Sequence, residues 1–483
     1  MSKFGFGSNG SDDDSEDGRR DDNNNNPFGF FFGGNMGGGM GHNMGGGSMS
    51  GGNMGDLFNH IGSMLSGFGA DMNSPEGKGS VNYAVAERIA RQHIAQAGKD
   101  KRPEAARSQA VAESVRLAEL WLDEATSLPA GATGSVAFGP VQWLEETLPT
   151  WKRVITPLAD KLGDAALTGM PEELQGQLGP MEGILKQINS MNFGTQLGAT
   201  LGEMAKGVVH STQWGVPLAK GSTAAVATAH VDDMASKLGC EKQEALIYLA
   251  AREAAHHRLF QHIPWLVERL ILDVEEYAAG LALDDSKMRE AMGEFNPEAM
   301  GDPARMQEMM EKLQGQDLSP EVVSANAHAR ERLETSLSLI EGWVDYVVGT
   351  ALEGRIPNAA MIGAAWSSFR NNGSPAMEAL TKAVGISFVA PKANEAADLW
   401  RRLEEAVGQE RRDKVWDHPD FLPVSSDLEN PAAFIGHVAF DDKEMEDFNP
   451  ISEIEKLEAE LKKQLGDEGN NGNDKNANDE DKD

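Results

Sequence analysis

The segment from Leu246 to Trp265 places the tightest constraint on how this chain can fold. It reads LIYLAAREAAHHRLFQHIPW, and its apolar residues recur about every 3.6 positions, at Leu246, Leu249, Ala250, Ala254 and Phe260. Such a spacing predicts a helix with one buried face. The same segment also crowds histidines, a glutamate and an arginine onto one helix. Both fold and function therefore depend on where this helix directs its polar side chains.

Residues four apart share a helix face, so Arg252 pairs with His256 and Glu253 with His257. The wording Arg-Glu-Ala-Ala-His is the zinc-peptidase motif His-Glu-x-x-His with arginine at the first histidine. In that motif two imidazoles bind one ion, and the glutamate activates the metal-bound water. Glu253 and His256 fit the base and second-ligand positions. The guanidinium of Arg252 cannot coordinate a cation and repels one.

A second candidate part of a site is Glu341-Gly-Trp-Val-Asp345. It lies on a long helical pattern that starts before Leu333 and ends near Gly354. In one class of zincin, a Glu followed four residues later by an Asp supplies the third ligand and a carboxylate that orients a ligand histidine. Glu341 flanks the apolar face of this helix, and a buried carboxylate needs a partner.

The remaining core reads as helices joined by glycine and proline. Alternating apolar and polar runs are short, and no internal repeat is found. We expect a helix to open at Ser319-Pro-Glu-Val, and Pro157 to lie in the first turns of another helix. Small residues three and four apart between Met181 and His210 predict close helix packing. The predicted fold class is mainly α, a helical core with at most a minor sheet.

Composition divides the chain of 483 residues into three parts. Residues 1–78 form a Gly/Asn/Met-rich tail that we expect to be disordered, because ordering so much glycine costs too much entropy. Its Phe and Met residues fit either a partner-binding segment or a tolerated extension, with a short amphipathic helix at 56–65. Residues 79–440 form the folded domain, with surface helices or a mobile insert at 288–313. Residues 441–483 form an acidic tail with one charged helix at 451–465.

Charge and cysteine content restrict the partners and the compartment. The chain has 43 basic and 76 acidic residues and a net charge of −33, which repels phosphate backbones and anionic membranes. We expect no nucleic-acid partner, and no membrane insertion, because no apolar run approaches a membrane span. Cys240 is the only cysteine, so an intramolecular disulfide is excluded and a cytoplasmic location is expected.

Several segments together resemble the actinobacterial zincin-like metallopeptidase family, whose members carry labels such as hydrolase or zinc-dependent metalloprotease. The resemblance covers about 80–435 and rests on the central helix, 341–345, QWLEETLP at 142–149, QLGATLG at 196–202, VPL at 216–218 and WDHPDFLP at 416–423. Some relatives keep a complete His-Glu-x-x-His. A large branch shares the Arg-Glu-Ala-Ala-His wording found in this chain.

The resemblance implies a zincin-like fold, zinc as the cofactor, and a peptide or protein as substrate or partner. Transferred residue by residue, it implies Glu253 as base, His256 and Glu341 as metal ligands, and Asp345 as the carboxylate that orients a ligand. The role of first ligand has no match, because Arg252 stands at that position.

Two functions remain open from the sequence. One is a zinc-dependent metallopeptidase-like hydrolase, in which a metal-bound water deprotonated by Glu253 attacks a peptide carbonyl. The other is a catalytically inactive zincin-like scaffold that acts by protein–protein interaction. In the scaffold, Arg252 replaces the charge of the metal and bridges Glu341 or Asp345.

Other residues could supply the missing ligand or support other chemistry. His257 shares a face with Glu253, and His230 and His262 are further candidates, although a lone histidine is more often structural. A di-iron site needs a second Glu-x-x-His, which the sequence lacks. The sequence has no Gly-x-Ser-x-Gly elbow and no phosphate loop. Cys240 has no evident base near it in the sequence, which favours a structural role.

Overall fold

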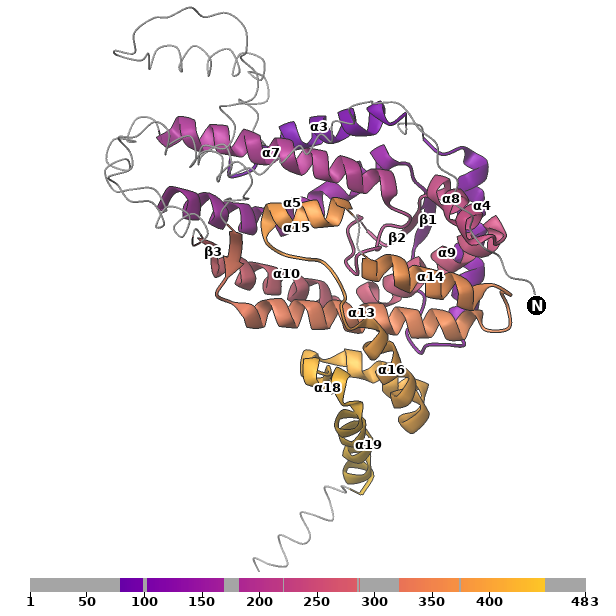
Figure 1. Ribbon diagram of the computed structural model, residues 1–483. Coiled ribbons are helices and arrows are strands. Elements are labelled where there is room, and N and C mark those ends of the chain that lie inside the picture. Colours follow the sequence, from indigo (N-terminus) through magenta and orange to yellow (C-terminus); the bar gives the residue numbers. More distant parts are fainter. Residues whose placement is uncertain are drawn as a thin grey trace, which may run out of the picture. The chain divides into compact units, whose positions relative to one another are not determined.

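Helix α9 (Lys242–His262) is buried along most of its length, which is unusual for a helix so rich in charged residues. In the computed structural model every residue from Ile247 to Leu259 is buried, including Arg252 and Glu253. Four helices pack against it (Figure 1): α8 (Thr228–Leu238), which directly precedes it in the chain, and three from distant parts of the sequence, α4 (Ala105–Leu122), α13 (Ala327–Leu352) and α14 (Ala359–Asn372). The structure describes residues 79–98, 102–168, 182–219, 221–284, 286, 321–372 and 375–447.

The other elements are mostly helices, as the sequence predicts. Before α9 they are α3 (Tyr83–Gln96), β1 (Gly134–Ala137), α5 (Pro140–Thr168), α7 (Glu182–Gly207) and β2 (Thr223–Val226). After α9 they are α10 (Pro264–Ala279), β3 (Leu281–Asp284), β4 (Glu321–Ser324), α15 (Pro375–Val384), α16 (Ala393–Val407), α17 (Gln409–Lys414), η3 (Val415–Asp417), η4 (Pro419–Phe421), α18 (Ser425–Glu429) and α19 (Pro431–Asp447).

The strands of the described part form two small sheets. Strands β1 and β2 pair in parallel with Gly134 opposite Thr223, and β3 and β4 pair antiparallel with Leu281 opposite Ser324. The expectation of a helical core with at most a minor sheet is confirmed. The predicted tail 1–78, the segment 288–313 and the predicted helices at 56–65 and 451–465 lie outside the described residues. Of the predicted tail 441–483, residues 441–447 continue α19.

The small residues of α7 allow α3 to pack closely against it, as expected. A Cβ added at Gly194 would lie 2.4 Å from the carbonyl oxygen of Asn82, and one at Gly198 would lie 2.4 Å from that of Ala86. At Gly202 the added Cβ would meet the His93 side chain at 2.7 Å. Side chains at these positions would push the two helices apart, so the four-residue glycine spacing sets their separation.

Gly342 also allows α16 to pack closely against α13, the helix that carries the carboxylates Glu341 and Asp345. A Cβ at Gly342 would lie 2.7 Å from the carbonyl oxygen of Ala393 on α16, so α16 packs against this position of α13 (Figure 1). The next residue, Trp343, is also buried and donates its indole N–H to Asp413, at 3.0 Å. The contact with α16 anchors this side of α13, while Glu341 and Asp345 reach α9.

Two local expectations are wrong. Pro157 does not lie near the start of a helix, because α5 runs unbroken over Pro140–Thr168 with Pro149 and Pro157 in its interior. The segment after Ser319 does not open a helix either. Residues Glu321–Ser324 form β4, and α13 begins only at Ala327. Pairing with β3 overrides the local Ser-Pro signal there, because tertiary contacts outweigh weak end preferences.

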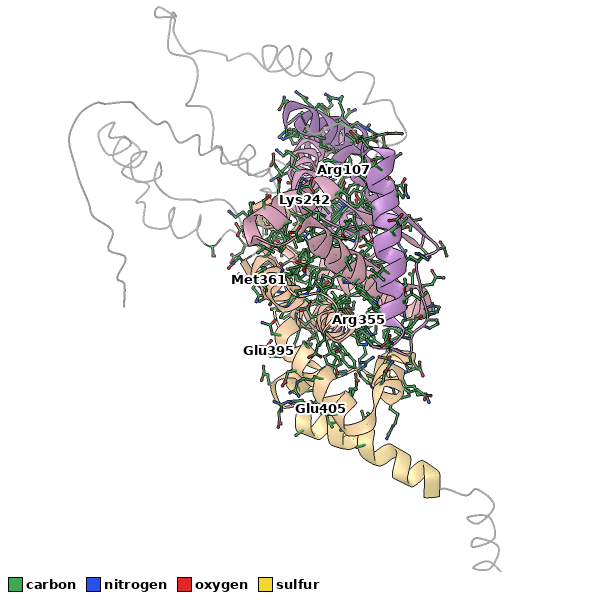
Figure 2. The ribbon with its side chains drawn as sticks, turned by 90° about the vertical axis from the view of Figure 1, so that its right-hand side faces the viewer. Arg107, Lys242, Arg355, Met361, Glu395 and Glu405 are labelled. Carbon is green, nitrogen blue, oxygen red and sulfur yellow. The ribbon has the colours of Figure 1, made fainter. Side chains whose placement is uncertain are left out.

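The first turn of α9 is tied to its neighbours by a shared carboxylate. Arg107 of α4 and Lys242 of α9 both reach Asp232 on α8, at 3.0 and 3.5 Å. Figure 2 labels both basic side chains on the face of the molecule that it presents. Within the part of the chain that the structure describes, no helix has the length and apolar character needed to cross a membrane.

Candidate functional site

Successive residues of α9 project in different directions, so the two charged residues Arg252 and Glu253 enter different clusters. Arg252 and His256 face the carboxylates of α13. Glu253 instead faces β2 and the segment that follows α7. The structure therefore brings four sequence-predicted site residues together and places the fifth, Glu253, with other partners.

The first group, here called the arginine–carboxylate cluster, consists of Arg252, His256, Glu341, Asp345 and Arg370. The guanidinium of Arg252 is fully buried and donates through Nη2 to Glu341 Oε2 at 2.6 Å and through Nη1 to Asp345 Oδ1. Arg370, in the last turn of α14, donates to Asp345 Oδ2 at 2.7 Å. One guanidinium thus spans both carboxylates, and a second braces them from α14.

Neighbouring charges determine the ionisation states of Glu341 and Arg252 in this cluster. Burial alone would raise the pKa of Glu341, but the charges of Arg252 and His256 outweigh it and lower the pKa to about 2. Burial would lower the pKa of Arg252, yet Asp345 and Glu341 raise it. Glu341 is therefore ionised at neutral pH, and Arg252 stays charged in the protein interior.

His256 contacts an acceptor through each ring nitrogen. Its Nδ1 lies 2.8 Å from the carbonyl oxygen of Arg252, and its Nε2 lies 2.9 Å from Glu341 Oε1. A ring nitrogen at this distance from an ionised carboxylate oxygen is the donor of the bond, because two acceptors would repel each other. In this arrangement Nε2 carries a proton and has no lone pair to offer a metal.

The second group, here called the glutamate hub, is built on Glu253, which is fully buried. Its Oε2 accepts from the backbone N–H and hydroxyl of Thr212, at 3.1 and 2.7 Å, and from His210 Nδ1 at 3.0 Å. Its Oε1 accepts from the Ser211 hydroxyl and from the Ala225 N–H at 3.0 Å. Five donors from two segments thus converge on one carboxylate.

The hub keeps Glu253 ionised. Burial would raise the pKa of Glu253, but the hydrogen bond from His210 and the nearby imidazole of His257 outweigh it and hold the pKa well below its usual range. Burial lowers the pKa of His210 despite its bond to Glu253. The hub therefore pairs a carboxylate with a histidine that burial keeps largely neutral.

The other histidines weighed as replacement ligands have their own partners. His230 Nδ1 lies 2.5 Å from the Val208 carbonyl oxygen, and His262 Nε2 lies 3.3 Å from that of Ala130. His257 Nε2 lies 3.4 Å from Glu253 Oε1. None of these three joins the arginine–carboxylate cluster through a contact among the described residues.

Sequence reasoning missed His210 and Arg370. His210 belongs to a short polar run, His-Ser-Thr, that follows the apolar pair Val208 and Val209. A polar triplet at the end of an apolar helix is a weak signal that could have marked it. Arg370 carries no such signal, because it enters the cluster from α14, a helix that the sequence patterns did not predict.

Zinc, which a zincin-like site implies, does not fit the residues present. Within the described ranges, no three His, Cys, Asp or Glu side chains are grouped so that they could hold a metal ion. The Arg252 guanidinium lies between Glu341 and Asp345, the two carboxylates assigned to the metal site. A fixed positive charge at that place repels a cation.

A small cavity adjoins the arginine–carboxylate cluster. Its volume is about 50 Å³, and Trp214, Trp366, Phe369 and Phe388 contribute aromatic walls, with Glu341 and Arg370 of the cluster also in its lining. The Arg252 guanidinium lies 4.9 Å from the centre of the Trp366 ring, a cation–π contact. The cluster thus supports one wall of the cavity and contributes polar groups to it.

Comparisons with known proteins agree with this fold. No curated protein matches the chain. A crystal structure of a "putative hydrolase with a novel fold" from Chloroflexus aurantiacus is similar over 76% of this chain and 100% of its own length, with 16% identity and a TM-score of 0.52. At that identity the likeness concerns the fold alone. The family model for zincin-like metallopeptidases matches residues 81–435. The chain belongs to the zincin-like metallopeptidase family.

Proposed function

We propose that this protein is a non-hydrolytic member of its family, a zincin-like scaffold that binds a peptide or protein segment. The observation that carries the proposal is the buried Arg252 guanidinium, which bridges Glu341 and Asp345 where a metal would be held. On this account the arginine supplies the positive charge that the carboxylates require. We also infer that the chain belongs to the Arg-Glu-x-x-His branch of the actinobacterial family and acts in the cytoplasm.

The energetics of the cluster support the proposal. For zinc to bind His256 and Glu341, Arg252 would have to leave its two carboxylates, and His256 would have to lose the proton on Nε2. Breaking a buried ion pair typically costs about 3–5 kcal/mol, because an uncompensated charge remains. The side chain of Arg252 is fully buried, so it would have to move before its charge could reach water.

The environment of Glu253 also supports the proposal. A general base must accept a proton near the working pH and must reach the group that it deprotonates. The pKa of Glu253 is held well below its usual range, and both of its oxygens accept hydrogen bonds from the chain itself. Its contacts are those of a structural anchor between α9, β2 and residues 210–212.

The hydrolase alternative keeps the family assignments: Glu253 as base, His256 and Glu341 as zinc ligands, and Asp345 as the orienting carboxylate. Family membership favours it. It requires a rearrangement that removes Arg252 from the cluster and frees Glu253 from five donors. The scaffold requires neither change, so we favour the scaffold.

Peptidase activity tests the proposal directly. The full chain is incubated with an unfolded protein substrate and zinc, and products are followed by mass spectrometry. We expect no cleavage by the wild type. Cleavage that disappears in His256→Ala, while circular dichroism shows an intact fold, would overturn the scaffold and favour the hydrolase. An exposed-site variant, Glu268→Gln, serves as the matched control, because Glu268 pairs with Arg153 at the exposed surface.

A further inference from the structure

The cavity beside the arginine–carboxylate cluster has hydrogen-bond donors without acceptors. Arg370 Nη1 donates to Asp345, and Nη2 lies 3.3 Å from Asn394 Oδ1. Its buried Nε–H has no acceptor among the described residues, and the same holds for the indole N–H of Trp366. Both residues line the cavity, and the Arg370 side chain is only 10% exposed. Buried donors without acceptors are costly, so a ligand that accepts hydrogen bonds would relieve them.

The side-chain acceptors at this cavity are already engaged. Glu341 Oε1 faces His256, and Glu341 Oε2 accepts from Arg252. Gln213 Oε1 accepts from the Val209 N–H at 2.8 Å. A ligand that enters the cavity therefore meets side-chain donors and has no free side-chain acceptor to satisfy. The cavity fits a carbonyl or carboxylate oxygen better than an amine or hydroxyl hydrogen.

The local charge favours a carboxylate over a carbonyl. One of the donors without an acceptor, the Arg370 Nε–H, belongs to a guanidinium and therefore carries positive charge. A buried positive charge attracts an anion strongly, because little water screens it. Charge-assisted hydrogen bonds to a carboxylate are also stronger than neutral ones.

The volume and the apolar walls of the cavity determine which chemical group can accompany the carboxylate in a ligand. Trp214, Phe369, Met377 and Phe388 present apolar surface. The volume of about 50 Å³ holds roughly four water-sized groups, which is the size of a leucine or isoleucine side chain. An apolar side chain next to a carboxylate is the combination found at the end of a peptide chain.

We propose that this cavity binds the C-terminal residue of a peptide that ends in a branched aliphatic side chain. The side chain fills the aromatic cavity, and the terminal carboxylate accepts from Arg370 Nε–H and Trp366 Nε1–H. Arg252 acts as a positioning residue, since it supports the Trp366 ring. The proposal rests on the scaffold function and specifies its partner: a protein or peptide recognised by its free, aliphatic C-terminus.

Calorimetric titration of the full chain with two probes tests this proposal. The probes are acetyl-Ala-Ala-Leu with a free carboxylate and the same peptide as its C-terminal amide. We expect the acid to bind at least about ten-fold more tightly than the amide, the difference typical of losing one strong charge-assisted contact. Equal affinities, or no binding of the acid to the wild type, would overturn the proposal.

Two conservative variants identify the donors. Trp366→Phe keeps the aromatic wall and removes the N–H, and Arg370→Lys keeps the charge and removes the Nε–H. Each should weaken binding of the acid by about ten-fold and leave the weaker binding of the amide almost unchanged. Arg401→Gln, at an exposed arginine on α16, is the control and should bind like the wild type. Unchanged affinity in both cavity variants would contradict the assignment.

Mass spectrometry of the acid probe after titration in the presence of zinc separates the two proposals. An intact probe that binds with the expected preference supports both. A probe that binds with that preference and is then cleaved supports the cavity assignment and overturns the scaffold function. An intact probe without the preference leaves the scaffold standing and removes the cavity assignment.

Discussion

The two faces of α9 differ in whether hydrogen-bonding groups near their charged residues remain free to bind a ligand. On one face, both oxygens of Glu253 accept hydrogen bonds from residues 210–212 and from Ala225. On the other, Arg252 and Arg370 pair with Glu341 and Asp345, but donors remain without acceptors beside an aromatic cavity. The first face satisfies both oxygens of its carboxylate, whereas the second leaves the Arg370 and Trp366 donors without acceptors beside a cavity. Adjacent residues of one motif can therefore serve different purposes, one in stability and the other in binding.

The comparison predicts that the hub contributes most to stability. Glu253→Gln should lower the free energy of unfolding by about 4 kcal/mol, because an amide places its own N–H groups against the hub donors and removes a buried charge. Urea unfolding followed by far-UV circular dichroism measures the loss. A loss below about 1 kcal/mol would show that the hub is not an anchor.

The arginine–carboxylate cluster should make stability depend on acid pH. The pKa of Glu341 is lowered from 4.5 to about 2 in the folded chain, so the ionised form stabilises the fold above the unfolded pKa. That contribution is lost as the pH falls through the folded pKa. The shift corresponds to about 3 kcal/mol, at about 1.4 kcal/mol per pH unit. Urea unfolding from pH 6 to 2 should show a drop in the wild type that is smaller by this amount in Glu341→Gln. Parallel curves for the two proteins would contradict the assigned role of Glu341.

Replacing Arg252 by lysine should lower the free energy of unfolding by less than the Glu253→Gln substitution does. A lysine keeps the positive charge but cannot donate to Glu341 and Asp345 through two arms of one planar group. We expect Arg252→Lys to destabilise the fold by about 2 kcal/mol. Thermal unfolding followed by far-UV circular dichroism measures the loss. A stability equal to that of the wild type would show that the two-carboxylate bridge is not needed.

The smallest effect should come from a single hub donor. Ser211→Ala removes the hydroxyl that donates to Glu253 Oε1 and leaves Ala225 N–H on the same oxygen. We expect a loss of about 1.5 kcal/mol, the usual value of one hydrogen bond to a charged group. Differential scanning calorimetry measures it. A loss as large as that of Glu253→Gln would mean that Ser211, and not the carboxylate, organises the hub.

The sequence predicts the two helices that carry the site, α9 and α13, but not all of the side chains that contact them. Helical spacing places Arg252 with His256 and Glu253 with His257, and a bridge from Arg252 to Glu341 or Asp345 was one of two open interpretations. The added partners come from distant parts of the chain: His210 lies 43 positions before its partner Glu253, and Arg370 joins the cluster from 118 positions after Arg252. No local pattern encodes such proximity.

The errors have the same origin. The Ser319-Pro-Glu-Val signal predicts a helix start, yet β4 forms there because β3 offers a partner strand. The surroundings of Glu253 are not a local property either: the motif offers it the position of a base, and the fold places five donors around its carboxylate. Local preferences decide the type of an element, whereas the role of a buried charge depends on the three-dimensional neighbours that neutralise it.

The zinc content of the purified wild-type chain tests the central claim most directly. The protein is dialysed against excess zinc, desalted and measured by plasma mass spectrometry, with Arg252→His as the comparison because it restores the complete motif. We predict zinc well below one per wild-type chain and a clear gain in Arg252→His. About one zinc per wild-type chain, lost in His256→Ala, would contradict the account.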